Sequence, residues 1–151
     1  MKKLFPIILI SIVFYCCKKS SHAQIKPILG TWIFKDTTYT VGFMSEQDNA
    51  SFECLADSNR KAWIGFTFYT PLLKSGTYAV VNSLDDSTQC LITTGDGIND
   101  NYNSTGKIGD TVKTTFAGDT IKISFRNISV QLNSDTQLVS GNLNCTNEFY
   151  P

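Results

Sequence analysis

Oxygen-bearing side chains that could bind a metal ion gather in one polar stretch, residues 95–109. Carboxylate and amide oxygens, which Ca²⁺ prefers as ligands, are carried there by Asp96, Asn99, Asp100 and Asn103. The stretch lacks the alternating ligand spacing and the closing glutamate of a helix-loop-helix calcium site. Loops also favour aspartate and asparagine for backbone reasons alone. We therefore expect a solvated loop, with a calcium site as the alternative.

Three cysteines lie beyond the N-terminal segment, and strand alternation places all three in the interior: Cys54, Cys90 and Cys145. Three thiols allow one disulfide, in any of three pairings, with one thiol left over. No Cys-x-x-Cys spacing is present, so we expect neither a metal site nor thioredoxin-like chemistry from them. The pattern fits three buried core thiols as well as it fits one disulfide.

The chain has one histidine, His22, which lies ahead of the region with regular patterning. That region therefore has no imidazole for a Ser-His-Asp or Cys-His arrangement, or for a His-based zinc site. Acids that could pair for glycoside hydrolysis are Glu53, Asp85, Asp86 and Asp100, and their spacing selects no pair. We expect a protein that is not an enzyme and needs no cofactor. A carboxylate-based hydrolase is the third of three functional hypotheses.

Large aromatic side chains could form a platform for a carbohydrate or an apolar ligand, because amphipathic rings supply contact area at a small entropic cost. The candidates are Trp63, Tyr69, Tyr78 and Tyr102. Alternating aromatic residues in a β protein are more often part of the core or of edge packing. Ligand binding by these rings therefore competes with plain packing.

Residues 1–19 have the layout of a secretory leader, with Lys2 and Lys3 ahead of an apolar run that ends at Cys16 and Cys17. The run is too short for a membrane-spanning helix, which needs roughly 20 apolar residues. We expect the protein to be exported.

The end of the leader resembles a bacterial lipoprotein signal, in which a cysteine is cut at its amino side and acylated. Cys17, with the small Cys16 before it, fits that pattern better than Cys16, which follows Tyr15. The resemblance implies a signal segment at 1–17, a tether at 18–27 and a lipid-anchored protein of the cell envelope, in the outer membrane or the periplasm. The alternative is cleavage after Ala23, which would release a soluble secreted protein.

Length and charge limit what the exported part can be. Residues 28–151 suit one domain with its own core. From Ile25 onward, nine lysine and arginine side chains stand against thirteen aspartate and glutamate side chains, a formal charge of −4. A mildly acidic domain has no electrostatic footprint for nucleic acid. The partners that we expect are the membrane, through the lipid, and a glycan, a small molecule or a protein.

From Gly30 onward, apolar and polar residues alternate, and turn residues recur at intervals of about 8–12 residues, which is typical of an all-β protein. We expect strands at 30–35, 38–43, 51–56, 62–70, 77–82, 87–94, 110–116 and 120–132, and a last strand after Asp135. Residues 44–49 are expected to be a polar connection. At Arg126 and Asn127 the alternation slips by one residue, which predicts a β-bulge. The pattern predicts an antiparallel β-sandwich of about eight or nine strands.

Two family resemblances bear on this fold. Gly30, Thr31 and Trp32 are similar to the Gly-x-Trp of lipocalin-like proteins, where the tryptophan closes one end of a ligand-holding barrel. That resemblance implies a carrier of a small apolar ligand, with Trp32 at the ligand and a late-strand arginine, Arg126, against it. Residues 63–145 resemble small Bacteroidota lipoproteins of unknown function, through the motifs Gly76-Thr77-Tyr78, Ser104-Thr105-Gly106 and Val139-Ser140-Gly141-Asn142-Leu143.

The Bacteroidota resemblance implies a β-sandwich and a location, since that family has no assigned activity. The sequence thus predicts an exported, lipid-anchored, single-domain all-β protein that acts as a non-enzymatic binding or surface-structural module. A lipocalin-like carrier is the alternative.

Overall fold

The protein is described by a computed structural model that covers residues 29–48, 50–56, 61–69, 75–97, 99–118 and 120–146. All regular structure in these ranges is β strand. The eleven strands are β1 (Gly30–Phe34), β2 (Thr37–Thr40), β3 (Phe43–Asp48), β4 (Ser51–Leu55), β5 (Trp63–Phe68), β6 (Gly76–Val80), β7 (Gln89–Gly95), β8 (Tyr102–Ser104), β9 (Thr111–Ala117), β10 (Thr120–Leu132) and β11 (Asp135–Thr146).

The expected leader, the tether and the lipidation site at Cys17 or Cys16 lie outside the described residues, as does the alternative cleavage site at Ala23. Within the ranges described, no helix has the length and apolarity needed to cross a lipid bilayer.

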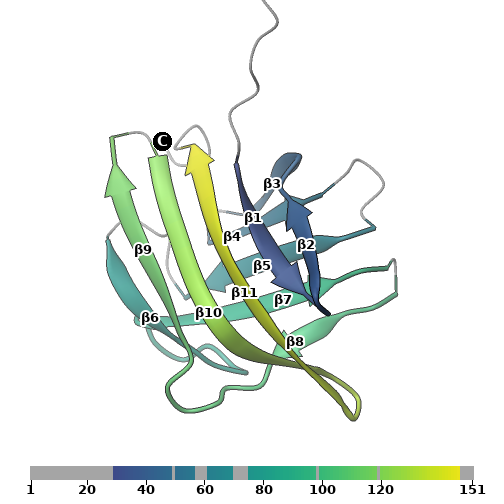
Figure 1. Ribbon diagram of the computed structural model, residues 1–151. Helices are drawn as coiled ribbons and strands as arrows, with labels where there is room; N and C mark the ends of the chain where they lie inside the picture. The colour runs from purple at the N-terminus through teal and green to yellow at the C-terminus, as the bar shows by residue number, and fades with distance from the viewer. Residues whose placement is uncertain are drawn as a thin grey trace, which may run out of the picture.

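All eleven strands belong to one hydrogen-bonded sheet: ten follow the order β2-β1-β11-β10-β9-β6-β7-β5-β4-β3, and β8 lies off this path. Figure 1 shows that this sheet folds back on itself: β9, β10, β11, β1 and β2 form a front half, and β7, β5, β4 and β3 lie behind it. The short strand β8 pairs with β10 and also with β7, so it links the two halves. The strand path ends at β2 and at β3, so the sheet is not a closed barrel.

The expectation of a purely antiparallel sheet with eight or nine strands is wrong in two respects. β6 and β7 are parallel, through Ala79 with Gln89 and Val80 with Cys90, so the sheet is mixed. Two further strands also form: β3 in the expected polar connection and β8 inside the expected loop. Pairing with neighbouring strands satisfies their backbone groups, and this outweighs the polar composition of both segments.

The expected strand at 38–43 is divided between β2 and β3. The Val41 N–H donates to the Gly30 carbonyl at 3.0 Å, whereas the next N–H, that of Gly42, donates to the Leu55 carbonyl at 2.8 Å. The chain therefore leaves the front half at Val41 and joins the rear half one residue later.

Aromatic rings from both halves fill the interior. Phe66 of β5 is 1% exposed. It stacks on Phe52 of β4, with 5.2 Å between ring centroids, and meets Phe125 of β10 edge-on at 5.3 Å. Phe66 therefore packs within the rear half and also against the front half, so both halves share one hydrophobic core.

β10 contains the expected β-bulge. Its register against β11 shifts between Phe125 and Ile128, and Asn127 has a φ of 52°, a left-handed conformation that asparagine tolerates. Arg126 and Asn127 together oppose Ser140 of β11. The bulge keeps both Phe125 and Ile128 in the core while Arg126 and Asn127 stay exposed.

Trp32 faces this core. It is fully buried, and its ring stacks on Tyr39 of β2 at 5.2 Å. Arg126 is exposed on the outer face together with Thr31 and Ile33, which flank Trp32 in β1 and point the other way. The lipocalin-based expectation of Arg126 against Trp32 is therefore wrong, because the two side chains leave opposite faces of the sheet.

Candidate functional site

The outer face of the front half carries a groove with a volume of about 670 Å³. We call it the outer groove. It is lined by residues of β1, β9, β10 and β11 and of the loop before β9, namely Thr31, Ile33, Gly109, Thr111, Lys113, Ser124, Phe125, Arg126, Asn127, Ser140, Gly141 and Asn142. Its size lies within the range of small-molecule sites, about 300–1,000 Å³.

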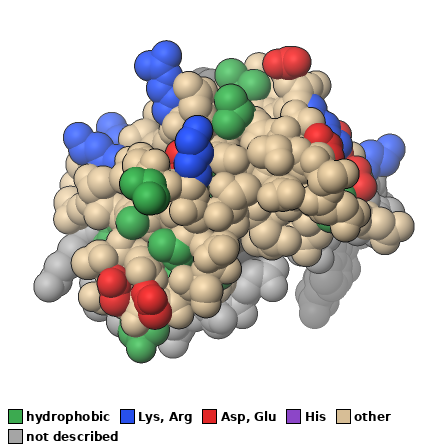
Figure 2. All heavy atoms as spheres, turned by 90° about the horizontal axis from the view of Figure 1, so that it is seen from below, with side chains coloured by type: hydrophobic (Ala, Val, Ile, Leu, Met, Phe, Trp, Pro, Cys, Tyr) green, Lys and Arg blue, Asp and Glu red, His purple; other side chains and the backbone are tan. Residues whose placement is uncertain are grey.

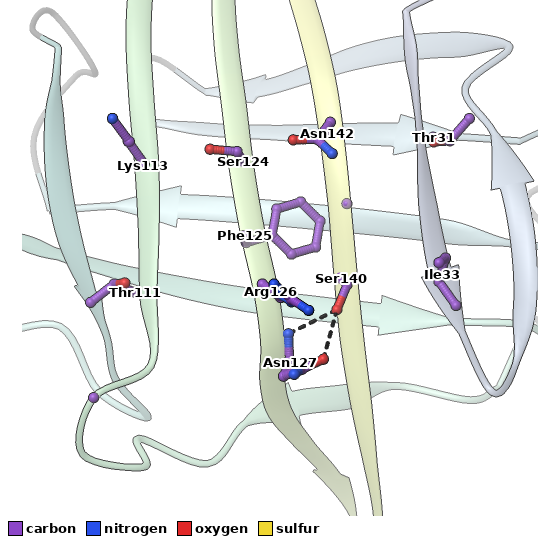
Figure 3. A pocket seen from close by; sticks show the side chains of 12 residues that line it. Thr31, Ile33, Thr111, Lys113, Ser124, Phe125, Arg126, Asn127, Ser140 and Asn142 are labelled. Atoms are coloured by element: carbon purple, nitrogen blue, oxygen red, sulfur yellow. Dashed lines mark hydrogen bonds between the residues drawn. The ribbon is translucent and has the colours of Figure 1, made fainter.

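One row of polar side chains crosses all four strands of the groove. Lys113 of β9 pairs with Ser124 of β10, Ser124 pairs with Asn142 of β11, and Asn142 pairs with Thr31 of β1. Figure 3 shows these four residues side by side on the same face. The row places an ammonium group, two hydroxyls and an amide at neighbouring positions, so it offers both donors and acceptors of hydrogen bonds.

A second row follows two residues along each strand, on the same face. It runs from Thr111 through Arg126 and Ser140 to Ile33, and Figure 3 shows it parallel to the first row. The bulge shapes this row: the Asn127 N–H donates to Ser140 Oγ at 2.8 Å, and Ser140 Oγ–H donates to Asn127 Oδ1 at 3.3 Å. These two bonds fix the backbone from which Arg126 projects.

The outer groove is locally cationic. Lys113 and Arg126 are exposed, and neither forms an ion pair with any residue that the structure describes. The twelve lining residues include no aspartate or glutamate. Asp110 lies between two of them in the chain, but its Oδ2 accepts a hydrogen bond from the Ser129 N–H at 2.8 Å. The groove therefore presents two positive charges within a domain that is acidic as a whole.

Charges at one end of the molecule are more evenly mixed than in the outer groove. Figure 2 shows the end of the molecule that lies at the bottom of Figure 1, where basic and acidic side chains are interspersed and apolar side chains form small separate groups. No single-sign charge field covers the described part of this end. The cationic character of the outer groove is thus a local property.

A smaller hollow of about 300 Å³ lies on the outer face of the rear half. Glu53 of β4 lines it and is only 6% exposed. The hydroxyls of Ser51, Thr67 and Thr93 also line it, and Ser51 Oγ–H donates to Thr67 Oγ1 at 3.2 Å. Glu53 is the only acid in this lining, so the hollow does not present a pair of carboxylates.

The four acids considered for hydrolysis lie at three places in the fold. Glu53 lines the rear hollow, and Asp100 lies in the polar loop. Asp85 and Asp86 lie in the turn before β7, where Asp86 Oδ1 accepts hydrogen bonds from the Thr88 hydroxyl and N–H, each at 2.6 Å. These bonds lower the pKa of Asp86. The structure therefore distributes these four acids over the rear hollow, the polar loop and the turn before β7.

Lys35 supplies a positive charge to two acids of the polar loop. Lys35 Nζ lies 3.1 Å from Asp96 Oδ1, 4.0 Å from Asp100 Oδ2 and 4.8 Å from the centroid of the Tyr102 ring. Burial lowers the pKa of Lys35, but hydrogen bonds with the Tyr102 hydroxyl and with Asp96 outweigh it, so the net pKa is raised. Lys35 thus sits beside two of the four side chains considered for calcium.

The other two calcium candidates are Asn99 and Asn103. Asn99 is exposed, and Asn103 Nδ2 donates to the Asn101 carbonyl at 3.4 Å. Among the residues that the structure describes, no group of three or more histidine, cysteine, aspartate or glutamate side chains could hold a metal ion. The contacts of Lys35 with Asp96 and Asp100 fit a polar loop that is held by this lysine.

The five aromatic residues considered for ligand binding are not gathered on one exposed surface. Tyr69 is 54% exposed, whereas Trp63 and Tyr78 are half-buried and Trp32 and Tyr102 are buried. An exposed platform that includes Tyr102 is therefore wrong, because that ring is buried by packing.

Tyr102 packs against a neighbouring ring and forms a hydrogen bond with an acid. It lies 5.1 Å from the Phe34 ring in an edge-on arrangement, and its hydroxyl donates to Asp135 Oδ2. This bond, with a second from Gln137 Nε2 at 2.7 Å, lowers the pKa of Asp135. Tyr102 thus ties β8 to the start of β11.

The outer groove was not among the sites expected from the sequence. Its residues come from the first strand and the last three, and no motif spans such a set. The sequence feature that could have indicated the groove is that the outward positions of 111–113 and 124–126 carry Lys113 and Arg126 and no acid. Comparison of the chain with protein-family models, with curated proteins and with solved structures found no match.

Proposed function

We propose that the protein is an exported, lipid-anchored, non-enzymatic binding module, and that its outer groove binds an acidic carbohydrate. The observation that carries this proposal is the pair Lys113 and Arg126 on a groove that is lined by hydroxyls and amides and has no carboxylate.

The ligand class follows from the chemistry of the lining. A guanidinium binds a carboxylate or sulfate through two parallel hydrogen bonds, and an ammonium adds a point charge. Ser124, Asn142 and Thr31 can exchange hydrogen bonds with sugar hydroxyls, since each both donates and accepts. Ile33, which is 47% exposed at the β1 end, offers apolar contact. Two cations are too few for a nucleic-acid surface on a domain of charge −4.

The packing of the interior supports a β-sandwich over a lipocalin-like barrel as the finer description of the fold. A carrier of an apolar molecule needs space between its walls, whereas Phe66 of the rear half meets Phe125 of the front half in direct ring contact. A binding site on an outer face agrees with such a packed core.

The export and anchoring parts of the proposal rest on residues 1–19. We expect intact mass spectrometry of the mature protein from its native host to show a diacyl or triacyl adduct on an N-terminal Cys17. One acyl chain binds a membrane only marginally, and two or more hold it stably. An unmodified N-terminus at Gln24 would refute the anchor and support a secreted form.

The groove is tested with the double variant Lys113→Ala/Arg126→Ala. We expect the wild-type protein to bind a short oligogalacturonate and the variant to bind it at least about tenfold more weakly, because charge-assisted hydrogen bonds are lost. Isothermal titration calorimetry at low and at high salt measures both affinities. A neutral oligosaccharide of the same length is the ligand control.

Lys122→Ala is the matched control variant, since Lys122 is an exposed cation of β10 that does not line the groove. We expect its affinity to stay within about twofold of the wild type. Failure of the wild-type protein to bind the acidic oligosaccharide, or equal losses in Lys122→Ala and the double variant, would contradict a specific groove.

A further inference from the structure

The two halves of the sheet meet at a pair of buried cysteines. Cys54 lies on β4 in the rear half and Cys145 lies on β11 in the front half. Their exposed fractions are 0% and 2%, and both belong to the one hydrophobic core. Both side chains are free thiols in the structure.

The two thiols are in contact. The Cys54 side chain is hydrogen-bonded to the Cys145 side chain, and this bond, together with burial, raises the pKa of Cys54 well above its usual value. A disulfide bond brings two sulfur atoms to about 2.05 Å, so it forms between thiols that the fold already places against each other.

The third cysteine is placed differently. Cys90 of β7 is fully buried, and its Sγ–H donates to the Leu91 carbonyl at 3.3 Å. Burial raises the pKa of Cys90, and neither of the other two cysteines is among the groups that affect it. Of the three pairings that the composition allows, the fold therefore brings one together.

We propose that Cys54 and Cys145 form a disulfide in the exported protein and cross-link the two halves of its core, while Cys90 remains a thiol. The proposal rests on the export that is part of the proposed function, because disulfides persist in oxidising compartments and are rare in the cytosol.

The oxidant is a disulfide of an envelope thiol–disulfide oxidase. The thiolate of one cysteine attacks a sulfur of that disulfide and releases one oxidase thiol, which leaves a mixed disulfide. The second cysteine of the pair then attacks the mixed disulfide and releases the other oxidase thiol. Two electrons and two protons pass from Cys54 and Cys145 to the oxidase. Since both cysteines are buried in the finished fold, the exchange takes place before β11 has packed.

The test uses the full chain with its own leader, made in a bacterial host. Cells are lysed with an alkylating agent so that free thiols are trapped, and peptides from the envelope fraction are mapped by mass spectrometry. We expect a cross-linked peptide pair that contains Cys54 and Cys145, and an alkylated Cys90. Alkylation of all three in envelope protein, or a cross-link that includes Cys90, would overturn the proposal.

A second arm separates failure of export from failure of the pairing. If the protein stays in the cytoplasm, the export premise fails, and so does the proposal for the exported form. The same protein, refolded in a buffer of oxidised and reduced glutathione, then reports on the pairing alone. A Cys54–Cys145 bond in that buffer supports the pairing, and its absence overturns the pairing as well.

Stability measurements add a readout from matched variants. Reduction should lower the melting temperature of the wild-type protein and of Cys90→Ala by roughly 10 °C, because the cross-link restricts the unfolded chain. The melting temperatures of Cys54→Ala and Cys145→Ala should not respond to reduction. A response in either of these two variants, or none in the wild type, counts against the cross-link.

Discussion

Replacing Phe66 with alanine is expected to lower the free energy of unfolding by about 4 kcal/mol, the cost of removing a large ring from a packed core. The ring is 1% exposed and contacts Phe52 of its own half and Phe125 of the other half. The variant loses the burial of the ring and leaves a cavity where β5 meets β10, since the two halves cannot close fully over it. Urea unfolding of the purified protein measures the loss.

Tyr69→Ala is the control for Phe66→Ala. Tyr69 comes one residue after β5 and is 54% exposed, so its removal should change the free energy of unfolding by no more than about 0.5 kcal/mol. Comparable losses in the two variants would mean that the ring of Phe66 does not join the halves as described.

Replacing Gly30 with alanine is expected to cost about 3 kcal/mol. A Cβ at Gly30 would lie 2.2 Å from the Asn142 carbonyl oxygen and 2.7 Å from the Leu143 Cα, both backbone atoms of β11. β11 is held on its other edge by β10, so it cannot move away without breaking that pairing. The φ of Gly30 is +113°, which adds backbone strain for any L-residue. Urea unfolding again gives the loss.

Gly109→Ala separates strain from the steric clash. Gly109 has a φ of +96°, but nothing lies within 4 Å of a Cβ built on it. We expect this variant to lose about 1 kcal/mol, the cost of a positive φ alone. If Gly30→Ala lost no more than Gly109→Ala, close packing of β1 on β11 would not explain the glycine.

Local alternation was sufficient to predict much of the fold. It placed Ile64, Phe66 and Phe68 on one face, and the structure buries all three in a central strand between β4 and β7. The slip at Arg126 and Asn127 predicted a bulge that the structure contains. Both predictions are correct because burial of one face of a strand makes apolar residues recur at every second position of the sequence.

Features that depend on distant partners were not predictable in this way. β3 and β8 are polar segments that become strands because β4, β7 and β10 offer them backbone partners. The parallel pairing of β6 with β7 likewise follows from the path of the whole chain. Lys35 beside Asp96 was missed for the same reason, since 61 positions separate the two residues.

The candidate site illustrates the same limit. The outer groove is built from outward-facing residues, which alternation labels as solvent-exposed and thus as unremarkable. Lys113 and Arg126 come to line one groove only when β9 pairs with β10, β10 with β11, and β11 with β1 in the observed registers. The large aromatic rings suggested a ligand-binding platform, but most of these rings pack within the fold.

Because β1 pairs with β11, the sheet cannot be completed until the last strand is present. Gly30, at the start of the first strand, pairs with Leu143 of the last. A chain that is made from its N-terminus has β1 and β2 long before their partner exists, and contacts between such distant residues make folding slow. The outer groove spans this seam, since Thr31 and Asn142 lie on its two sides. The outer groove is therefore complete only once the final strand has paired, and a chain that ends before β11 lacks the β11 part of its lining.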